Sequence, residues 1–561
     1  MKALQFLALV LPATCVLACA GVAPHAAPTG DAGAAGGTAA TATGGAAGGA
    51  AGRASGGAAG GSTGGAAGGA AGSAAPPLTD FPTAPVFVDP TIAPSVPASF
   101  STTSTRAGSA PCITAPAAGT LMPRNWLRPQ VTYTPAADEN LFEITFTVPG
   151  FSDPLRVYTR DRAYTLDKTL WDGLRASEPN VAIQVTVKAL TLSATGAVQQ
   201  GVSKPAQSSF VIAPVDAPGK IVYWAVTNVG SLRGFGIGEE GTEDVLVPAQ
   251  VPNRNPTTET CIGCHAATPD GQAVGFTMGR GTADLNDIAV IGDATTGQVP
   301  AYVTTTALAA IRKLGGIPAY SPAHWSPGDR IVILSDGGDL QWVQLDGDGQ
   351  GVLGRQGDAH GATEPTFSHD GQKVVYVSTD SISDGREAAG PGDLMQIPYA
   401  AGAGGDAIPL PGASTADHTE YYPSFSPDDA FVAFTRITGN AIVYSNADAE
   451  VFVVPSSGGT AVRLAANDAP ACQTALTSPG LTNDWPKWAP DVGLAGGKKY
   501  YWVTFSSNRT GVAQLYVAGL VVDGTGAVTT FPALYLWNQP SGDSNHTPSW
   551  DNYQIPPIII D

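Results

Sequence analysis

Residues 425–429 read Phe-Ser-Pro-Asp-Asp, and residues 431–435, Phe-Val-Ala-Phe-Thr, follow almost at once. An aromatic residue here ends one apolar run, a polar turn reverses the chain, and a β-branched and aromatic run begins the next strand. A unit of this kind that recurs every few tens of residues predicts an array of small, similar sheets.

Comparable units recur through the second half of the chain. They lie at 268–271, 325–329, 367–371, 425–429, 488–491 and 550–552. One position just before or at the start of each turn serves to measure the spacing. These positions are Ala267, Trp325, Phe367, Phe425, Trp488 and Trp550, and they are 58, 42, 58, 63 and 62 residues apart. This spacing predicts one four-stranded sheet per unit, with loops of variable length.

The repeat resembles that of TolB-type β-propellers, whose blades carry an aromatic residue, Ser-Pro-Asp-Gly and an apolar strand. The resemblance implies a propeller over 218–561. Only eleven residues follow Trp550, too few for four strands, so we expect the runs 220–227 and 243–247 to complete its sheet. Six blades closed by strands from both ends are expected, and five or seven remain open.

Residues 80–217 carry short alternating or β-branched runs separated by turn residues, as at 141–148 and 181–189. This pattern predicts an antiparallel β-sandwich, with one short helix at 167–176 and Trp126 and Trp171 in the core. The segment resembles a fibronectin-type or immunoglobulin-like module. The fold class expected for the whole chain is therefore all-β.

The first 18 residues pair a basic start with an apolar run too short to span a bilayer, which predicts a signal peptide and export. Val16-Leu17-Ala18-Cys19 resembles the bacterial lipobox, which implies a lipid on Cys19 and a periplasmic or outer-membrane lipoprotein. The alternative is a soluble protein cleaved near Ala20. Residues 19–79, mostly Gly, Ala, Ser and Thr, are expected to form a disordered tether.

The chain has a net charge of −19 with 13% charged residues, and no basic stripe suits phosphates. Nucleic acid is therefore not an expected partner, and the membrane is expected to be reached only through the lipid. Cys112 and Cys472 can form a disulfide in an exported protein, and two buried thiols are the alternative.

Residues 261–265 read Cys-Ile-Gly-Cys-His. In this spacing two thiols attach haem c covalently and the histidine ligates its iron. Cys261, Cys264 and His265 are thus candidate cofactor ligands, expected in the loop that leads into the first blade. The stretch resembles the cytochrome c family in this motif alone, since prolines and β-strand signals surround it.

Three further histidines precede the repeat turns, namely His360, His418 and His546. They are expected to face the same mouth of the propeller's central channel as His265. One of them, His546 first, would complete the coordination of the iron. The same histidines, with nearby aspartates, could instead hold a divalent metal without haem.

No nucleophile elbow, phosphate loop or His-Glu-x-x-His motif is found, so no catalytic residue is assigned. One hypothesis is an exported haem c protein that transfers electrons to a redox partner in the cell envelope. The alternative is a non-enzymatic TolB-like binding or scaffold lipoprotein without haem, in which the Cys pair forms a local disulfide or holds a metal.

Overall fold

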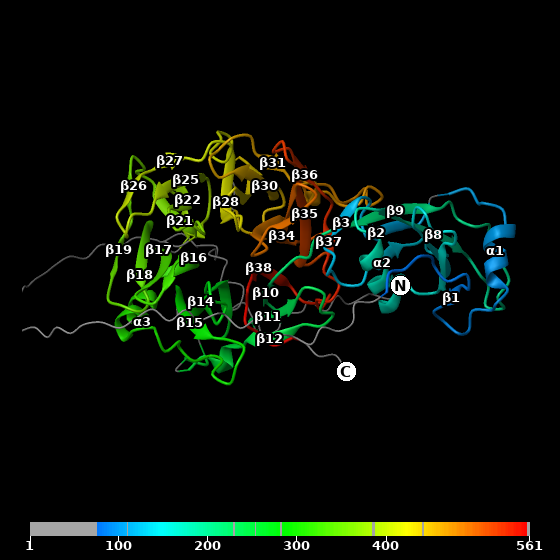
Figure 1. Cartoon of the computed structure of the whole chain (residues 1–561), viewed down its shortest axis with the longest axis horizontal. Helices are drawn as coiled ribbons and strands as arrows, with labels where there is room; N and C mark the ends of the chain where they lie inside the picture. Colours follow the sequence, from blue (N-terminus) through cyan, green and yellow to red (C-terminus); the bar gives the residue numbers. More distant parts are fainter. Residues whose placement is uncertain are drawn as a thin grey trace, which may run out of the picture. The chain divides into compact units, whose positions relative to one another are not determined.

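A computed structural model describes residues 76–557, except 109, 228–229, 253, 258, 281–282, 384–386 and 440–442. The expected signal peptide, Cys19 and nearly all of the expected tether lie outside the described residues. The described fold is all-β, and its α-helices are α1 (Val96–Thr102), α2 (Lys168–Ser177) and α3 (Thr305–Ile311) (Figure 1). Within the described ranges, no helix has the length and apolar character needed to cross a membrane.

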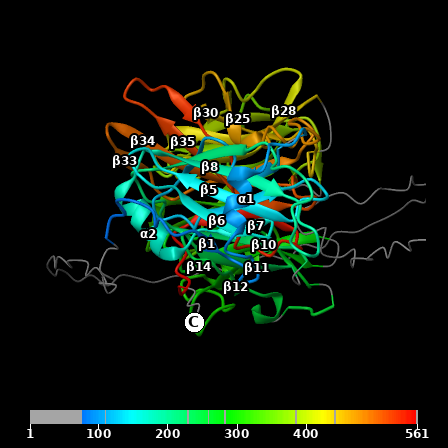
Figure 2. The same cartoon turned by 90° about the vertical axis from the view of Figure 1, so that its right-hand side faces the viewer.

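The N-terminal part contains two sheets. The strands are β1 (Val86–Phe87), β2 (Cys112–Ala115), β3 (Thr120–Met122), β4 (Gln130–Thr134), β5 (Leu141–Thr147), β6 (Leu155–Thr159), β7 (Ala163–Thr165), β8 (Ala182–Leu190) and β9 (Ala206–Ile212). One sheet has the order β1-β6-β5-β8-β9-β3 and the other β2-β4-β7. Figure 2 shows β5, β6 and β8 of the larger sheet.

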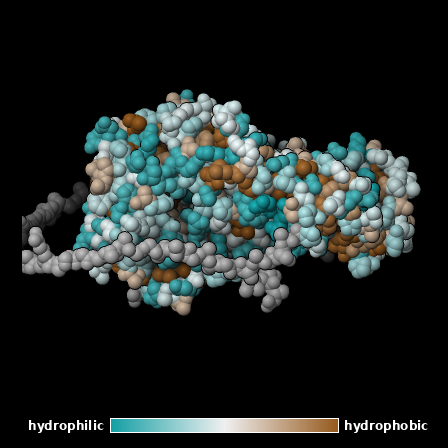
Figure 3. All heavy atoms as spheres, in the orientation of Figure 1, coloured by the Kyte–Doolittle hydropathy of each residue, from teal (hydrophilic) through white to brown (hydrophobic). Residues whose placement is uncertain are grey.

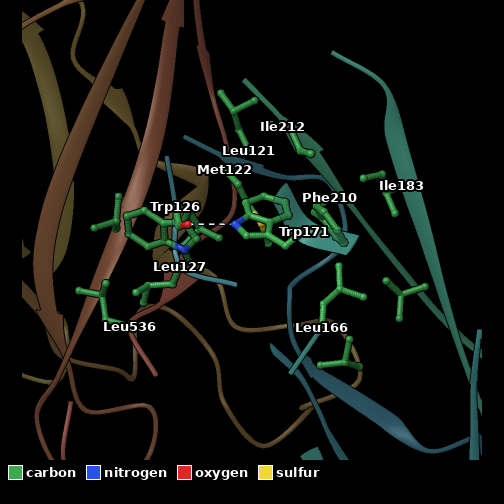
Figure 4. Packing of buried hydrophobic residues seen from close by; sticks show 14 of the residues in the cluster. Leu121, Met122, Trp126, Leu127, Leu166, Trp171, Ile183, Phe210, Ile212 and Leu536 are labelled. Atoms are coloured by element: carbon green, nitrogen blue, oxygen red, sulfur yellow. Dashed lines mark hydrogen bonds between the residues drawn. The ribbon is translucent and has the colours of Figure 1, made fainter. Parts of the chain in front are cut away.

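Side chains that alternate along these strands build one core between the two sheets. Ile183, Val185 and Val187 of β8 are fully buried together with Val131 of β4. Trp171 of α2 enters the same core, and its indole Nε1 donates to the Trp126 carbonyl at 3.1 Å (Figure 4). Both tryptophans expected in the core are therefore buried there.

The C-terminal part contains six successive larger sheets. Their orders are β12-β11-β10-β38, β13-β14-β15, β16-β17-β18-β19, β21-β22-β25-β27, β28-β29-β30-β31 and β32-β34-β35-β36, the last also pairing β33 and β37. Their outer strands include β15 (Ala283–Val290), β18 (Asp339–Gln344), β19 (Gln350–Val352), β25 (Asp393–Pro398), β27 (Ile408–Pro409), β30 (Glu450–Pro455), β31 (Val462–Arg463), β33 (Gly493–Ala495), β35 (Gln514–Val522), β36 (Val528–Thr530) and β37 (Leu534–Tyr535). Their second strands, β14 (Ala273–Arg280), β17 (Asp329–Asp336), β22 (Lys373–Thr379), β29 (Phe431–Thr438) and β34 (Lys498–Ser507), lie where the apolar runs predict them.

The first strands of these sheets contact one another in a circle. They are β13 (Ile262–Ala267), β16 (Gly315–Ser326), β21 (Gly361–Phe367), β28 (His418–Phe425), β32 (Asn483–Trp488) and β38 (Asn545–Asp551). Each contacts the next along the chain, and β38 contacts β13. Figure 1 shows the sheets set around a common centre, a propeller-like arrangement.

Strand β38, near the C-terminus, completes a sheet begun more than 300 residues earlier. It pairs with β10 (Lys220–Ala225), with Trp550 opposite Ile221. β11 (Ser231–Gly236) and β12 (Glu243–Leu246) extend the same sheet outward. The runs expected to complete the sheet of Trp550 therefore occupy that place.

The alignment of the second repeat on Trp325 is wrong. In β21, Phe367 pairs with Val374 directly after a register shift, and in β16 the residue in the same situation is Tyr320, which pairs with Val332. β16 runs on to a second turn beyond Trp325 because it is longer than the other first strands. Tyr320-Ser321-Pro322 is therefore the second unit of the repeat.

The N-terminal sheets are joined to the later part of the chain in two ways. Cys112 of β2 and Cys472 form a disulfide, with Cα atoms 5.5 Å apart. The N-terminal core also continues into buried residues of the last sheet, such as Trp502 and Val517. On the outside, the exposed large hydrophobic residues that the structure describes are scattered, and Figure 3 shows apolar residues among hydrophilic ones.

Candidate functional site

Every first strand of the six sheets has a break in its pairing at the same position. The register shifts between Ile262 and His265 in β13 and between Thr363 and Thr366 in β21, and the other four sheets repeat the shift. Such bulges bend a strand and change the direction of its side chains. Here the bulges recur in all six first strands, which contact one another in succession.

Four of these bulges hold a residue with left-handed backbone directly before a proline. The residues are Glu364 (φ 51°), Tyr422 (φ 52°), Trp485 (φ 58°) and Thr547 (φ 41°). Non-glycine residues rarely adopt this region, and a following proline disfavours it further. Strained positions of this kind cluster at functional sites. The space that these four residues surround is therefore a candidate functional site.

The residues after the bulges line a cavity of about 170 Å³, here called the mouth cavity. All six first strands, or the turns that follow them, contribute to it. Its lining includes His265, Ala266, Ala267, Pro318, Ala319, Tyr320, Pro365, Thr366, Phe367, Ser424, Phe425, Lys487, Trp488, Ser549, Trp550 and Asp551. Aromatic and small side chains thus share the lining with several polar groups, and a ligand pocket needs groups of both kinds.

Two groups of opposite charge lie in the mouth cavity. Burial lowers the pKa of Lys487 to about 8, against the attraction of Asp551 and Glu364. Burial also raises the pKa of Asp551 to about 6, against the attraction of His369 and Lys487. At neutral pH the ammonium of Lys487 and the carboxylate of Asp551 are therefore both mainly charged, and both residues line this small, partly desolvated space.

Glu364 lies at the bulge of β21 and is almost fully buried. Its carboxylate accepts hydrogen bonds from the backbone amides of Ala388 (3.0 Å) and Tyr422 (2.8 Å). Burial raises its pKa to about 7, although these two bonds oppose the shift. Glu364 therefore ties β21 to its neighbour β28 at the bulge.

The haem-type residues lie in a strand and not in the expected loop. β13 contains Cys264 and His265, and Cys261 immediately precedes it. The motif stands in a strand because His265 to Ala267 pair with β14 (Ala273–Arg280). Of the three candidate ligands, His265 alone lines the mouth cavity.

These residues do not fit a covalently bound haem in this arrangement. Cys261 is 2% and Cys264 1% exposed, in an apolar cluster with Met278 and Phe276. The imidazole of His265 has Nδ1 3.2 Å from the Gly263 carbonyl and Nε2 3.3 Å from the Val222 carbonyl, and burial lowers its pKa to about 4. No ring nitrogen thus faces a space for an iron, and the cavity is smaller than pockets for drug-sized ligands.

The other three histidines do not join His265. His360 and His418 precede their repeat aromatics by seven residues, whereas His265 precedes Ala267 by two. This difference of five residues places His360 and His418 roughly 16 Å from the level of His265 along the strands. His360 is exposed and pairs with Asp380 at 2.8 Å, and Nδ1 of His418 lies 3.3 Å from the Ala416 carbonyl.

His546 is buried between aromatic rings. It stacks on Tyr444, with ring centroids 5.6 Å apart, and meets Trp485 edge-on at 5.9 Å. Burial lowers its pKa to about 4. Among the described residues, no three His, Cys, Asp or Glu side chains are grouped so as to hold a metal ion. The expected histidine cluster is therefore not assembled.

Lys487 and Asp551 were not among the candidates from sequence. A signal was present in part. Lys487 stands directly before the repeat aromatic Trp488, where the other units have Ala, Thr or Ser once the second unit is aligned on Tyr320, and Asp551 stands directly after Trp550. A charged residue at a position otherwise occupied by small residues can mark a site. The sequence interpretation rested instead on the Cys-x-x-Cys-His motif at residues 261–265.

No protein-family model matches this sequence, and no curated protein does. Similar solved structures include a TolB candidate from Agrobacterium tumefaciens, with 16% identity, a TM-score of 0.25, and coverage of 41% of this chain and 87% of its own. Kuenenia stuttgartiensis hydrazine synthase has 11% identity, a TM-score of 0.35, and coverage of 61% and 48%. An oligogalacturonate lyase in complex with manganese has 14% identity, a TM-score of 0.26, and coverage of 57% and 75%. We take no function from any of them.

Proposed function

We propose that the chain is an exported binding protein of the cell envelope, anchored by a lipid on Cys19 and without haem. In this proposal the C-terminal sheets form a closed six-bladed propeller, and the N-terminal sheets form a sandwich that serves as a second module. The mouth cavity is the ligand site. The protein binds its ligand and does not transform it.

The convergence of all six first strands on one cavity carries the proposal. Six bulges at one register direct side chains there, and four of them hold a strained residue that the fold must stabilise. Sites in small-molecule binding proteins likewise combine aromatic and apolar side chains with polar groups that orient the ligand. Strained residues of this kind lower stability, and a ligand site at the cavity explains why the fold keeps four of them there.

A variant that fills the cavity tests the proposal. Ser424 of β28 lines the cavity, and Ser424→Trp would occupy it with an indole. We expect wild-type protein purified without denaturation from the bacterial envelope to release a small molecule on acid extraction, and Ser424→Trp to release at least ten-fold less. Mass spectrometry of the extract measures this.

Val352→Trp is the matched control, because Val352 is 53% exposed at the outer strand β19 (Gln350–Val352). It should release as much ligand as the wild type. Circular dichroism and the melting temperature establish that each variant is folded. Equal release from all three folded proteins would overturn the assignment of the mouth cavity.

The haem c hypothesis stays a prediction of residues 261–265, and one experiment decides between it and our proposal. The chain is expressed with a haem-maturation system, and the tryptic peptide that contains Cys261 and Cys264 is weighed. We expect the unmodified mass and no Soret absorbance. A peptide heavier by one haem would establish the haem protein and overturn our proposal.

A further inference from the structure

Two residues of opposite charge line the mouth cavity and do not form an ion pair with each other. Lys487 comes from β32 and Asp551 from the neighbouring first strand β38, and both line the cavity. Each affects the pKa of the other, so they are near enough to interact through space. The structure nevertheless has no ion pair within 4.0 Å between these two side chains.

The other titratable groups near the cavity already have partners. The His369 ring lies 2.9 Å from the Asp429 carboxylate, which also accepts the backbone amides of His369 and Asp370. Glu364 accepts its two backbone amides. Among the described groups at this mouth, Lys487 and Asp551 therefore remain as the charged side chains that have no oppositely charged group within 4.0 Å, and the carboxylate of Asp551 has only the backbone amide of Asn552 beside it.

Aromatic and small residues lie beside this pair in the lining, together with polar residues, and the space is small. Phe367, Phe425, Trp488 and Trp550 line the cavity, as do the small side chains of Ala266 and Ala319. In such surroundings an ion pair interacts more strongly than in water, because less solvent screens it. A volume of about 170 Å³ excludes a large ligand and admits a small one.

We infer that the mouth cavity binds a small zwitterion of the α-amino-acid class, whose carboxylate lies on Nζ of Lys487 and whose ammonium lies on the carboxylate of Asp551. This inference rests on the proposed function and names its ligand class. A simple anion at Lys487 would be repelled by Asp551, and a simple cation at Asp551 by Lys487. A molecule with both charges complements both groups, and the aromatic walls accept its apolar part.

Calorimetric titration at pH 7 with each of the twenty standard L-amino acids, one at a time, tests the inference. Acetate and methylammonium serve as probes with one charge each. We expect at least one amino acid to bind the wild type, and both single-charge probes to bind at least ten-fold more weakly than it does. This comparison uses wild-type protein alone and so does not depend on the folding of a variant.

Variants then locate the site. Lys487→Met and Asp551→Asn should each weaken the binding of that amino acid at least ten-fold, while their melting temperatures show that they fold. Lys498→Met is the matched control, because Lys498 is exposed at the start of β34, and it should bind as the wild type does. Lys487→Arg keeps the positive charge and should retain more affinity than Lys487→Met.

The outcomes separate this inference from the function on which it rests. If no amino acid binds, but native protein still releases a molecule that Ser424→Trp lacks, the mouth cavity binds a ligand of another class and the inference fails alone. If an amino acid binds folded Lys487→Met and Asp551→Asn as tightly as the wild type, its site lies elsewhere and the inference fails. If no amino acid binds and no ligand is released, both fail.

Discussion

Replacement of Cys112 and Cys472 together by alanine is expected to lower the free energy of unfolding by about 2–4 kcal/mol. The disulfide joins residues 360 positions apart, and a cross-link restricts the unfolded chain more as the loop it closes becomes longer. It also ties β2 of the N-terminal sheets to the segment before β32. Urea denaturation followed by tryptophan fluorescence measures the loss.

Reduction supplies an independent control for this effect. Wild-type protein and the double variant should unfold at the same urea concentration when both are in a reducing buffer, because the Cys112–Cys472 bond is then absent from both. Each single variant should match the double variant, because either replacement removes the bond. A double variant as stable as the oxidised wild type would show that the cross-link contributes nothing to stability.

The strands could be predicted from sequence because their signals are local. Runs such as 373–378 and 431–435 follow polar turns, and β22 and β29 begin at their first residues. The helix expected at 167–176 is α2, capped by Asp167, which accepts the amides of Thr169 and Leu170. Periodicity and turn chemistry act within a few residues, so they are visible in the chain itself.

The register of the second repeat could not be read in the same way. Two similar triplets, Tyr320-Ser321-Pro322 and Trp325-Ser326-Pro327, lie five residues apart. Each satisfies the local pattern of an aromatic residue before a turn. Pairing with β17 decides between them, because a register shift before Ala319 places Tyr320 in the mouth cavity. Strand pairing is a non-local choice that no local pattern records.

The candidate site was predicted in part for a similar reason. His265 does line the mouth cavity, as its place in the repeat suggested. The cysteines beside it face an apolar cluster, since the bulge in β13 changes the direction of neighbouring side chains. A motif fixes the spacing of residues along the chain, whereas a bulge decides which of them share a face.

Asp484 provides the second large expected effect, on the pH dependence of stability. This aspartate of β32 is fully buried, and neither carboxylate oxygen has a hydrogen-bond partner in the described structure. Burial alone raises its pKa to about 8. An isolated buried carboxylate is costly when ionised, so the folded protein holds the proton well above the pH at which the unfolded chain releases it.

The sign of the effect follows from proton linkage. Between about pH 4 and 8 the folded state keeps a proton on Asp484 that the unfolded state has lost, so the free energy of unfolding falls as the pH rises through this window. Asp484→Asn cannot ionise. Relative to the wild type, we expect the variant to gain about 2–4 kcal/mol of stability between pH 5 and pH 9.

Urea denaturation of both proteins at pH 5, 7 and 9 measures this change. The difference between the two proteins isolates Asp484, because Glu364, Asp551 and Lys487 titrate equally in both. Asp491→Asn, at an exposed turn three residues beyond Trp488, is the control and should follow the wild type at every pH. A constant difference between wild type and Asp484→Asn from pH 5 to 9 would mean that Asp484 is ionised throughout, and hence that a partner for its carboxylate exists in the folded protein.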